Sequence, residues 1–389
     1  MRLLARDVFI PCRNGRPVFP GFVSYISARD PVLLHRYGWV DESDTYDDFA
    51  DSVSRDNGAT WSKPVPRLRS REVPGGRLRY AENACFFDAG TGKLLTLCSR
   101  AVYPDDRHRI GNRFEVTWDL YDPLTETWRG EQTIAHDLPG GLGISFCFPL
   151  KTRRGTLIVP AYSLLVDEEG RPRHYGDYAP ALHASLAIRG QFLPGGDIAW
   201  ECGQPVAVDA ARSSRGFSEN AIVELTDGRL AMVLRGDNGA YPERPGYKWH
   251  CFSEDEGRTW SEPEPLPCAD GSFIESGSNG CALFRSQKTG KLYFVGNLAL
   301  DGDRANANWP RSPLIIAEVA EEPFGLRRET ITVIDRRAPH EPPLTQMSNF
   351  RFYEDRQTGD VVLFLSRYGE HDQANWKLAD YYRYRVEVN

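Results

Sequence analysis

The chain has 389 residues, of which 41% are hydrophobic and 26% charged, a balance typical of folded globular proteins rather than disordered ones. Its net charge of −7 gives no electrostatic reason to expect a nucleic acid or an anionic membrane surface as a partner. The sequence holds no apolar run long enough to span a bilayer.

The first residues, MRLLARDVFIPCRNG, lack the continuous apolar stretch of a signal peptide. Four of the eight cysteines lie inside apolar, strand-like runs, where a free cysteine behaves as a small hydrophobe: Cys85, Cys98, Cys147 and Cys281. No CxxC pair is present, and the Asp105-Asp106 pair lacks calcium-loop spacing. We therefore expect a reduced, cytoplasmic protein without a metal or other cofactor, or a secreted one if a signal segment has been removed.

One pattern recurs along the chain: a polar start, an apolar strand, a turn containing glycine and a second apolar strand. Six copies begin at Pro20, Ala81, Gly143, Ser218, Ser278 and Ser348, roughly 60 to 75 residues apart. No long segment shows a helical apolar period, so helix should be scarce. The pattern predicts an all-β, six-bladed β-propeller that forms one domain over residues 1–389. Two tandem sandwiches, the alternative, would not explain six matched units.

A second motif occurs twice, as SRDNGATW from Ser54 to Trp61 and as SEDEGRTW from Ser253 to Trp260. In such a turn the Asp carboxylate can accept backbone N–H bonds, the Gly supplies a positive φ, and the Trp packs between neighbouring sheets. A weaker copy, YDPLTETW, begins at Tyr121. We expect each turn to join the two outer strands of a blade and to serve stability rather than chemistry.

The first strand of each propeller blade lines the central channel, and its start opens on the same face as the end of the second strand. The predicted starts carry Glu82-Asn83, Ser145, Glu219-Asn220, Ser278-Asn279 and Ser348-Asn349. The predicted ends carry Arg36, Arg100, Tyr162, Arg235, Asn297 and Arg367. We expect four arginines and two glutamates around one opening, where carboxylates or an anionic ligand would offset the like charges.

The repeated S-x-D-x-G-x-T-W turn is the Asp-box of the sialidase superfamily, which the chain resembles over nearly its whole length. The segment SENAIVELTDGRLAMVLRG resembles the sialidase segment in which a Glu opens one strand and an Arg closes the next. The resemblance implies that Glu219 acts as a base and that Arg235 holds the substrate carboxylate. In LLHRYGWVDESD it implies a binding Arg36 and an acid/base Asp41, with Asp44 as the alternative.

The chain also departs from that family. Val18 stands where the family has an Arg on the first strand, and Arg16, two residues earlier, could replace it. Met347 or Ser348 stands at the position of the family's nucleophilic Tyr, while Tyr353 lies further along the strand. The third family Arg corresponds to Arg311 or Arg304.

These features predict a sialidase-superfamily exo-glycoside hydrolase that removes a terminal anionic sugar from an oligosaccharide or glycoconjugate. Asp41 would be the acid and Glu219 the base or nucleophile. The expected substrate-binding residues are Arg36, Arg100, Arg235, Arg311, Arg367, Glu82 and Asn349. Three alternatives remain open: a true exo-α-sialidase, a lyase acting on uronate-linked polysaccharide, and a non-catalytic carbohydrate-binding propeller.

Overall fold

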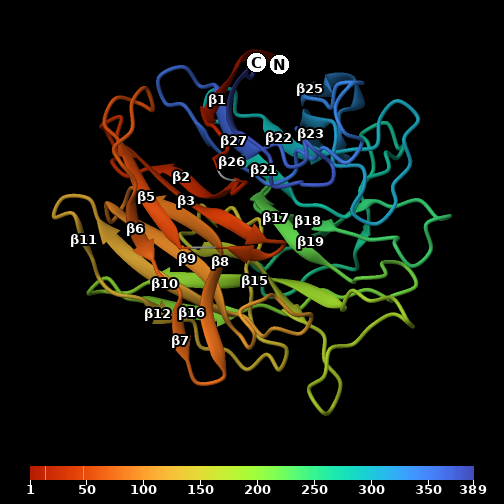
Figure 1. Ribbon diagram of the computed structural model, residues 1–389, viewed down its shortest axis with the longest axis horizontal. Helices are drawn as coiled ribbons and strands as arrows, with labels where there is room; N and C mark the ends of the chain where they lie inside the picture. The colour runs from red at the N-terminus through yellow and green to blue at the C-terminus, as the bar shows by residue number, and fades with distance from the viewer. Residues whose placement is uncertain (14, 47) are drawn as a thin grey trace. The chain divides into compact units, whose positions relative to one another are not determined.

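The computed structural model describes residues 1–389 with the exception of residues 14 and 47. Its strands form six antiparallel sheets (Figure 1). Within the described residues the helical structure is a single short 3₁₀ turn, η1 (Arg328–Thr330). The predicted fold class, an all-β six-bladed β-propeller with scarce helix, is confirmed, and each sheet is one blade.

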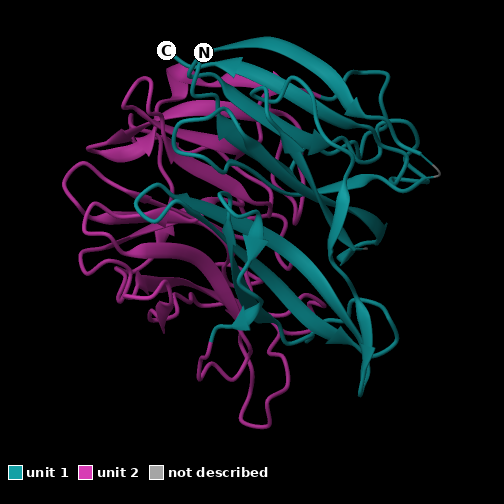
Figure 2. Cartoon of the chain, turned by 90° about the vertical axis from the view of Figure 1, so that its left-hand side faces the viewer, with its two compact units in different colours: residues 1–134, 337–389 teal, residues 135–336 magenta. Residues whose placement is uncertain are grey.

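The chain divides into two compact units of three blades each (Figure 2). Unit 1 contains residues 1–134 and 337–389. Its blade 1 consists of β2 (Val18–Tyr25), β3 (Leu33–Glu42), β4 (Thr45–Tyr46), β5 (Phe49–Ser54) and β6 (Val65–Leu68). Its blade 2 consists of β7 (Arg71–Val73), β8 (Gly76–Asp88), β9 (Lys93–Tyr103), β10 (Glu115–Asp122), β11 (Thr127–Trp128) and β12 (Gln132–Thr133). Its blade 6 consists of β26 (Phe350–Glu354), β27 (Val361–Ser366), β28 (Tyr381–Glu387) and β1 (Arg2–Ile10).

Unit 2 contains residues 135–336. Its blade 3 consists of β13 (Leu150–Lys151), β14 (Leu157–Leu164), β15 (His183–Phe192) and β16 (Ile198–Cys202). Its blade 4 consists of β17 (Ser218–Glu224), β18 (Leu230–Arg235), β19 (Lys248–Ser253) and β20 (Glu264–Pro265). Its blade 5 consists of β21 (Cys281–Arg285), β22 (Leu292–Asn297), β23 (Leu314–Glu321), β24 (Phe324–Leu326) and β25 (Thr332–Asp335). The single-domain organisation stays a prediction.

Both ends of the chain build blade 6. The N-terminal strand β1 pairs antiparallel with the C-terminal strand β28, from Arg2 opposite Glu387 to Ile10 opposite Tyr381. The two termini therefore lie side by side (Figure 1). This pairing joins residues almost a full chain length apart, so unit 1 can form only after the last strand has been made.

The six predicted hairpins correspond to β2–β3, β8–β9, β13–β14, β17–β18, β21–β22 and β26–β27. The prediction was wrong in detail for blade 3, where the first strand is reduced to the two residues of β13. Phe146 takes a φ of 51°, which interrupts an extended strand, and Gly143 makes only an isolated bridge to Tyr162. The segment before β13 is therefore a loop.

The two motif turns have the same geometry and join the third and fourth strands of blades 1 and 4, as predicted. In the first, Ser54 Oγ accepts the Gly58 N–H at 2.8 Å, and Asp56 accepts both the Thr60 N–H at 2.8 Å and its hydroxyl. Gly58 has a φ of 84°. In the second, Ser253, Asp255, Gly257 and Thr259 make the same bonds, and Gly257 has a φ of 83°.

All eight cysteines are free, and five of them are buried. Burial raises the pKa of the Cys251 thiol to about 12, so it stays protonated at neutral pH. A search of the described residues finds no helix of the length and apolarity needed to cross a bilayer.

Candidate functional site

The first strands of neighbouring blades pack against one another within each unit. In unit 1, β2 contacts β8 and β26, and in unit 2, β17 contacts β21. On its other side β17 contacts β14, the second strand of blade 3, whose first strand has only two residues. Three of these strands carry a bulge, in β2 after Pro20, in β8 after Tyr80 and in β17 after Ser218. A bulge takes a residue out of the ladder and re-aims its side chain. In β8 and β17 the bulge contains a glutamate, Glu82 and Glu219.

Glu219 is the centre of a charged cluster in unit 2. Its φ is 47°, a left-handed conformation that a non-glycine residue adopts at a cost of about 1–3 kcal/mol. Its side chain is 20% exposed and accepts a hydrogen bond from Arg235. The Ser145 hydroxyl lies 3.5 Å from the same Oε1 atom. The strained bulge therefore presents a carboxylate that solvent can reach.

Arg235 lies at the end of β18, where the sequence placed it, opposite Ser218 in the ladder. Its Nε donates to Ser278 Oγ at 2.8 Å and its Nη2 to Asn308 Oδ1 at 3.1 Å. Asn308 also accepts from Arg215 Nη1 at 3.3 Å through its side chain and from Arg311 Nε at 3.3 Å through its backbone carbonyl. One asparagine thus holds three guanidinium groups in place.

Lys248 is the fourth cation of this cluster. It lies on β19 opposite Arg235 in the ladder and is 2% exposed. Its Nζ donates to the carbonyl oxygens of Gly277, at 3.2 Å, and Asn279, and to Asn279 Oδ1 at 3.0 Å. The ammonium group therefore ties blade 4 to the segment that leads into blade 5.

The arginines decide the charge of Glu219. Burial alone would raise the pKa of this carboxyl, but Arg235, Arg311, Arg215 and Lys248 outweigh burial and lower the pKa below its ordinary 4.5. Glu219 is therefore ionised at neutral pH. Four cations surround this carboxylate, and Asp237, which lies near Arg215, is a second anion of the cluster. The excess of positive charge suits an anionic ligand.

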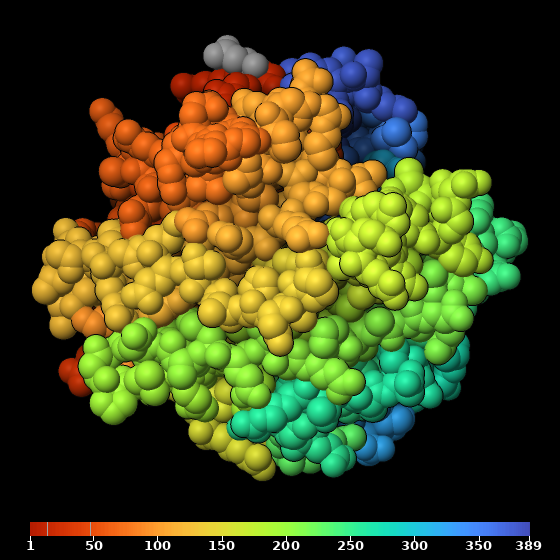
Figure 3. Space-filling model, turned by 90° about the horizontal axis from the view of Figure 1, so that it is seen from below, coloured from red at the N-terminus to blue at the C-terminus, as the bar shows by residue number. Residues whose placement is uncertain are grey.

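A long connection between β14 and β15, residues 165–182, lies at the surface (Figure 3, yellow-green). Its Tyr178 lies near Arg215 and Arg235 of the cluster. Tyr178 from this connection packs on Gly239, where a Cβ would lie 2.0 Å from the Tyr178 hydroxyl. Burial and the negative charge of Asp237 raise the pKa of Tyr178 to about 12. The phenol is thus a protonated donor at neutral pH and is poorly suited to be a nucleophile.

Glu82 is the centre of a smaller cluster in unit 1. Its carboxylate accepts a hydrogen bond from Arg351 Nη2 at 2.7 Å. Arg351, on β26, is 3% exposed at its side chain, and its Nε donates to the Gly21 carbonyl at 2.7 Å. The backbone at the Gly21 bulge therefore helps to hold an arginine that pairs with the Glu82 carboxylate. Asn349, the other predicted binding residue here, directly precedes β26 and is half-buried.

Asp41 lies within β3, which continues to Glu42, rather than in the loop after that strand. Its Oδ1 accepts from Arg16 at 2.9 Å and its Oδ2 from Arg79 at 3.4 Å. Arg79 is 6% exposed and also pairs with Asp106 at 2.6 Å. Asp44 lies in the following turn, is exposed and has a φ of 56°. The acid role of Asp41 or Asp44 stays a prediction.

Three of the predicted binding arginines already have carboxylate partners. Arg36 lies inside β3 rather than at its end, and its guanidinium contacts Asp51 at 2.6 and 2.8 Å. Arg100, also inside its strand β9, pairs with Glu115 and Glu131. Arg367 is 1% exposed and lies between two glutamates, Glu341 at 2.6 Å and Glu370 at 2.8 Å. Their substrate-binding roles stay predictions, and the two strand-end positions were wrong.

Arg36 faces a cavity of about 450 Å³ between blades 1 and 2. Arg67 and Trp128 also line it, with the Arg67 guanidinium carbon 4.0 Å from the indole centroid. Arg67 pairs with Asp119 at 2.6 Å across this cavity. The charges of Arg36 and Arg67 are thus paired with carboxylates, and arginine covers the indole face.

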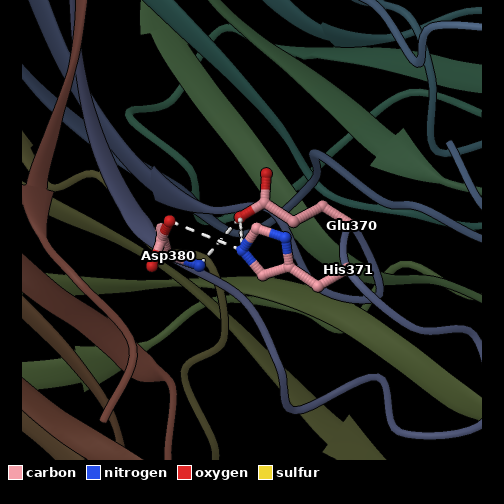
Figure 4. Close-up of side chains that lie close together, drawn as sticks. All are labelled: Glu370, His371 and Asp380. Atoms are coloured by element: carbon pink, nitrogen blue, oxygen red, sulfur yellow. Dashed lines mark hydrogen bonds and ion pairs between the residues drawn. The ribbon is translucent and has the colours of Figure 1, made fainter.

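A cluster in blade 6 has the residue types of a metal site, Glu370, His371 and Asp380 (Figure 4). Glu370 already binds Arg367 and accepts the Tyr382 hydroxyl at 3.0 Å and the Asp380 N–H at 2.8 Å. Asp380 accepts the Cys12 N–H at 2.7 Å. These contacts explain the arrangement without an ion, and we assign no metal to it.

Sequence reasoning missed several residues of the two clusters, namely Arg215, Lys248, Asn308 and Arg351, and it also missed Arg79, which pairs with Asp41. Arg351 could have been found, because it lies two residues after Asn349 on the same strand face. Of the two candidates for the third family arginine, Arg311 lies beside Glu219, whereas Arg304 pairs with Glu275 at 2.6 Å and is 61% exposed at its side chain. Met347 and Tyr353 are both buried, Tyr353 in a hydrophobic cluster.

A family model described as a BNR repeat-like domain matches residues 49–325. A search of curated proteins finds no match. Among solved structures, the K499G mutant of NanB sialidase from Streptococcus pneumoniae is 12% identical, with 99% of this chain and 70% of that chain covered and a TM-score of 0.63. The intramolecular trans-sialidase from Ruminococcus gnavus is 13% identical, with 98% and 97% covered and a TM-score of 0.62. The α-L-arabinanase of Penicillium chrysogenum is 12% identical, with 100% and 99% covered and a TM-score of 0.56.

Proposed function

The chain belongs to the BNR repeat-like family of the sialidase superfamily, and from this premise we propose that it is an exo-acting glycoside hydrolase that removes a terminal anionic sugar from a glycan. Structures of similar fold include sialidases and an arabinanase, so a glycosidase activity is common to proteins that differ in the sugar they accept. The substrate class must therefore be argued from the residues of this chain.

The observation that carries the proposal is the cluster around Glu219. A carboxylate on a strained bulge faces three guanidinium groups and an ammonium group. Guanidinium groups recognise a carboxylate or sulfate through paired hydrogen bonds, and strain of this kind is concentrated at functional sites. An anionic sugar would supply the negative charge that this cluster lacks.

In this proposal Glu219 serves as the base or nucleophile, because its lowered pKa keeps it ionised. Arg235 and Arg311 hold the anionic group of the sugar. Asp41 remains the proposed acid, and it would have to leave Arg16 or Arg79 in order to protonate a leaving group.

The test is a panel of fluorogenic glycosides that includes N-acetylneuraminate, glucuronate, galacturonate and neutral arabinofuranoside, assayed with wild type and with Glu219→Gln. We expect release of one of the anionic sugars and a fall in kcat of about 10³-fold in Glu219→Gln. Glu262→Gln is the matched control, because it makes the same change at an exposed glutamate of unit 2 outside the cluster, and its kcat should stay close to that of wild type.

The remaining alternatives are distinct outcomes of the same panel. Release of N-acetylneuraminate would identify a true exo-α-sialidase, and an ultraviolet-absorbing unsaturated product from a uronate polysaccharide would identify a lyase. Binding of an anionic sugar without turnover of any glycoside would support a carbohydrate-binding propeller and contradict the hydrolase.

A further inference from the structure

The resemblance to sialidases assigns no role to Lys248, yet this lysine is buried in the cluster around Glu219. Its three hydrogen-bond partners are all oxygen acceptors: the Gly277 carbonyl, the Asn279 carbonyl and Asn279 Oδ1. An ammonium group has one proton for each of these oxygens. A neutral amine has two protons and a lone pair, and that lone pair would face an oxygen.

The segment that Lys248 holds also positions Arg235. Ser278 lies between the two residues whose carbonyls Lys248 binds, and its hydroxyl accepts from Arg235 Nε at 2.8 Å. Asn279 Nδ2 donates to the Pro310 carbonyl at 3.2 Å, directly before Arg311. The ammonium group therefore hydrogen-bonds directly to the segment that contacts Arg235 and the residue before Arg311, the two arginines proposed to bind the anion.

We infer that Lys248 is a positioning residue that sets the alkaline limit of anion binding in blade 4: its ammonium form orders residues 277–279 and adds a positive charge beside Arg235. The inference rests on the proposed function, because it concerns binding at the same cluster. It adds a residue and a regulation by pH that the resemblance does not supply.

The groups around Lys248 make its charge sensitive to alkaline pH. The pKa of the amine is lowered from 10.5 to about 8, chiefly by burial; the positive charges of Arg235 on β18 and Arg311 before β23 act in the same direction, and Glu219 on β17 opposes them. The Cys281 thiol on β21 also faces Lys248, and burial raises the pKa of that thiol to about 11, so the thiol stays neutral when the lysine titrates.

The direction of the pH dependence follows from linkage. An anion beside Lys248 favours the ammonium form, so the pKa of Lys248 is higher in the complex than in the free protein. Below pH 8 the lysine is charged in both states, and affinity does not depend on it. Above pH 8 binding must take up a proton, and affinity falls by up to about tenfold per pH unit.

The experiment measures proton uptake on binding. Wild type, Lys248→Met and Lys248→Arg are titrated by calorimetry with N-acetylneuraminate and with glucuronate at pH 6.0, 7.0 and 9.0, in buffers of different ionisation enthalpy. Lys291→Met, which removes an exposed lysine of unit 2, is the matched control. The pH titration of the lysine Cε signals by NMR follows the same amine without a ligand, and the Lys248 signal is assigned by its loss in Lys248→Met and in Lys248→Arg.

We expect a Lys248 signal that titrates near pH 8, uptake of a proton at pH 9.0 by wild type and by Lys291→Met, and about tenfold weaker binding there than at pH 7.0. Lys248→Met should bind weakly at every pH, and Lys248→Arg should keep its affinity at pH 9.0 because guanidinium stays charged. If Lys248→Met does not fold, the NMR titration of wild type and the binding by Lys248→Arg carry the test.

The two ideas fail in different ways. If wild type binds at pH 6.0 and keeps the same affinity without proton uptake at pH 9.0, or if the Lys248 signal titrates near pH 10.5, the role of Lys248 is overturned and the proposed function stands. If wild type binds neither anion at pH 6.0, where Lys248 is protonated, the proposed anionic substrate is overturned.

Discussion

Glu82 in unit 1 and Glu219 in unit 2 occupy corresponding positions in their blades. Each lies in the bulge of the first strand of a blade, and each pairs with an arginine, Arg351 or Arg235. Glu82 accepts from Arg351 Nη2, and the Nε and Nη1 of that arginine donate to the backbone carbonyls of Gly21 and Phe350. Glu219 has a positive φ, and three guanidiniums and an ammonium surround it.

The difference teaches that an ion pair is not by itself a functional site. The pair of Glu82 and Arg351 balances its own charge and is tied to the backbone, as a structural ion pair is. The cluster of Glu219 has more cations than carboxylates and a backbone conformation that costs energy. We expect the pair of Glu82 and Arg351 to contribute to stability and the cluster of Glu219 to contribute to binding.

The largest expected effect comes from removing each arginine. Arg235→Met should lower kcat/KM by about 10³-fold with a small change in stability, since truncating one member of a buried charged pair at a binding site costs about 2–5 kcal/mol. Arg351→Met should leave kcat/KM within about threefold of wild type but lower the free energy of unfolding by about 3 kcal/mol. Steady-state kinetics and urea unfolding measure both. If Arg351→Met lost activity while keeping its stability, the comparison would be wrong.

A smaller effect should follow from removing the asparagine that holds the arginines. Asn308→Ala takes away the amide oxygen that accepts from Arg235 and Arg215, so the guanidiniums lose their fixed geometry. We expect KM to rise about tenfold with kcat nearly unchanged. Asn112→Ala, which removes a half-buried asparagine of unit 1, is the control and should change neither constant. An unchanged KM in Asn308→Ala would show that the arginines hold their positions without it.

The acid limb of the pH profile tests the charge of Glu219. Its pKa is lowered below 4.5, and the carboxylate form is the active one, so activity should be kept down to below pH 4.5 and be lost as pH falls through the lowered pKa. Arg311→Met removes one of the charges that oppose burial, and the limb should move up by about one pH unit. Profiles of kcat/KM between pH 3 and 7 measure this shift, and a limb that does not move would exclude Arg311 as a cause.

The smallest effect is expected at the motif turns, which lie outside both clusters. Asp255→Asn weakens the bonds to the Thr259 N–H and hydroxyl, at 2.9 and 2.6 Å, and should lower Tm by about 2 °C without changing kcat/KM. Asp303→Asn, an exposed change in the same unit, should leave Tm unchanged. A loss of activity in Asp255→Asn that exceeds its loss of stability would give the turn a role in catalysis.

The sequence by itself determined the blades, the motif turns and one half of the site. The six hairpins and the two Asp-box turns are local patterns. Apolar strand residues and turn residues that lie within a few positions of one another specify each of them. Glu219 and Arg235 were found for the same reason. They lie at the start and the end of one hairpin, β17–β18, and the register of its ladder places Arg235 opposite Ser218.

Tertiary structure alone decided which charges are paired. Arg36 and Arg367 looked like Arg235 in the sequence, but Asp51 and two glutamates from neighbouring strands and loops neutralise them. Arg215, Lys248 and Asn308 joined Glu219 from three other segments, and no pattern of nearby residues marks them. The charge of a site is a sum over contacts between distant parts of the chain, so it is fixed only when the strands and loops that carry these residues pack together.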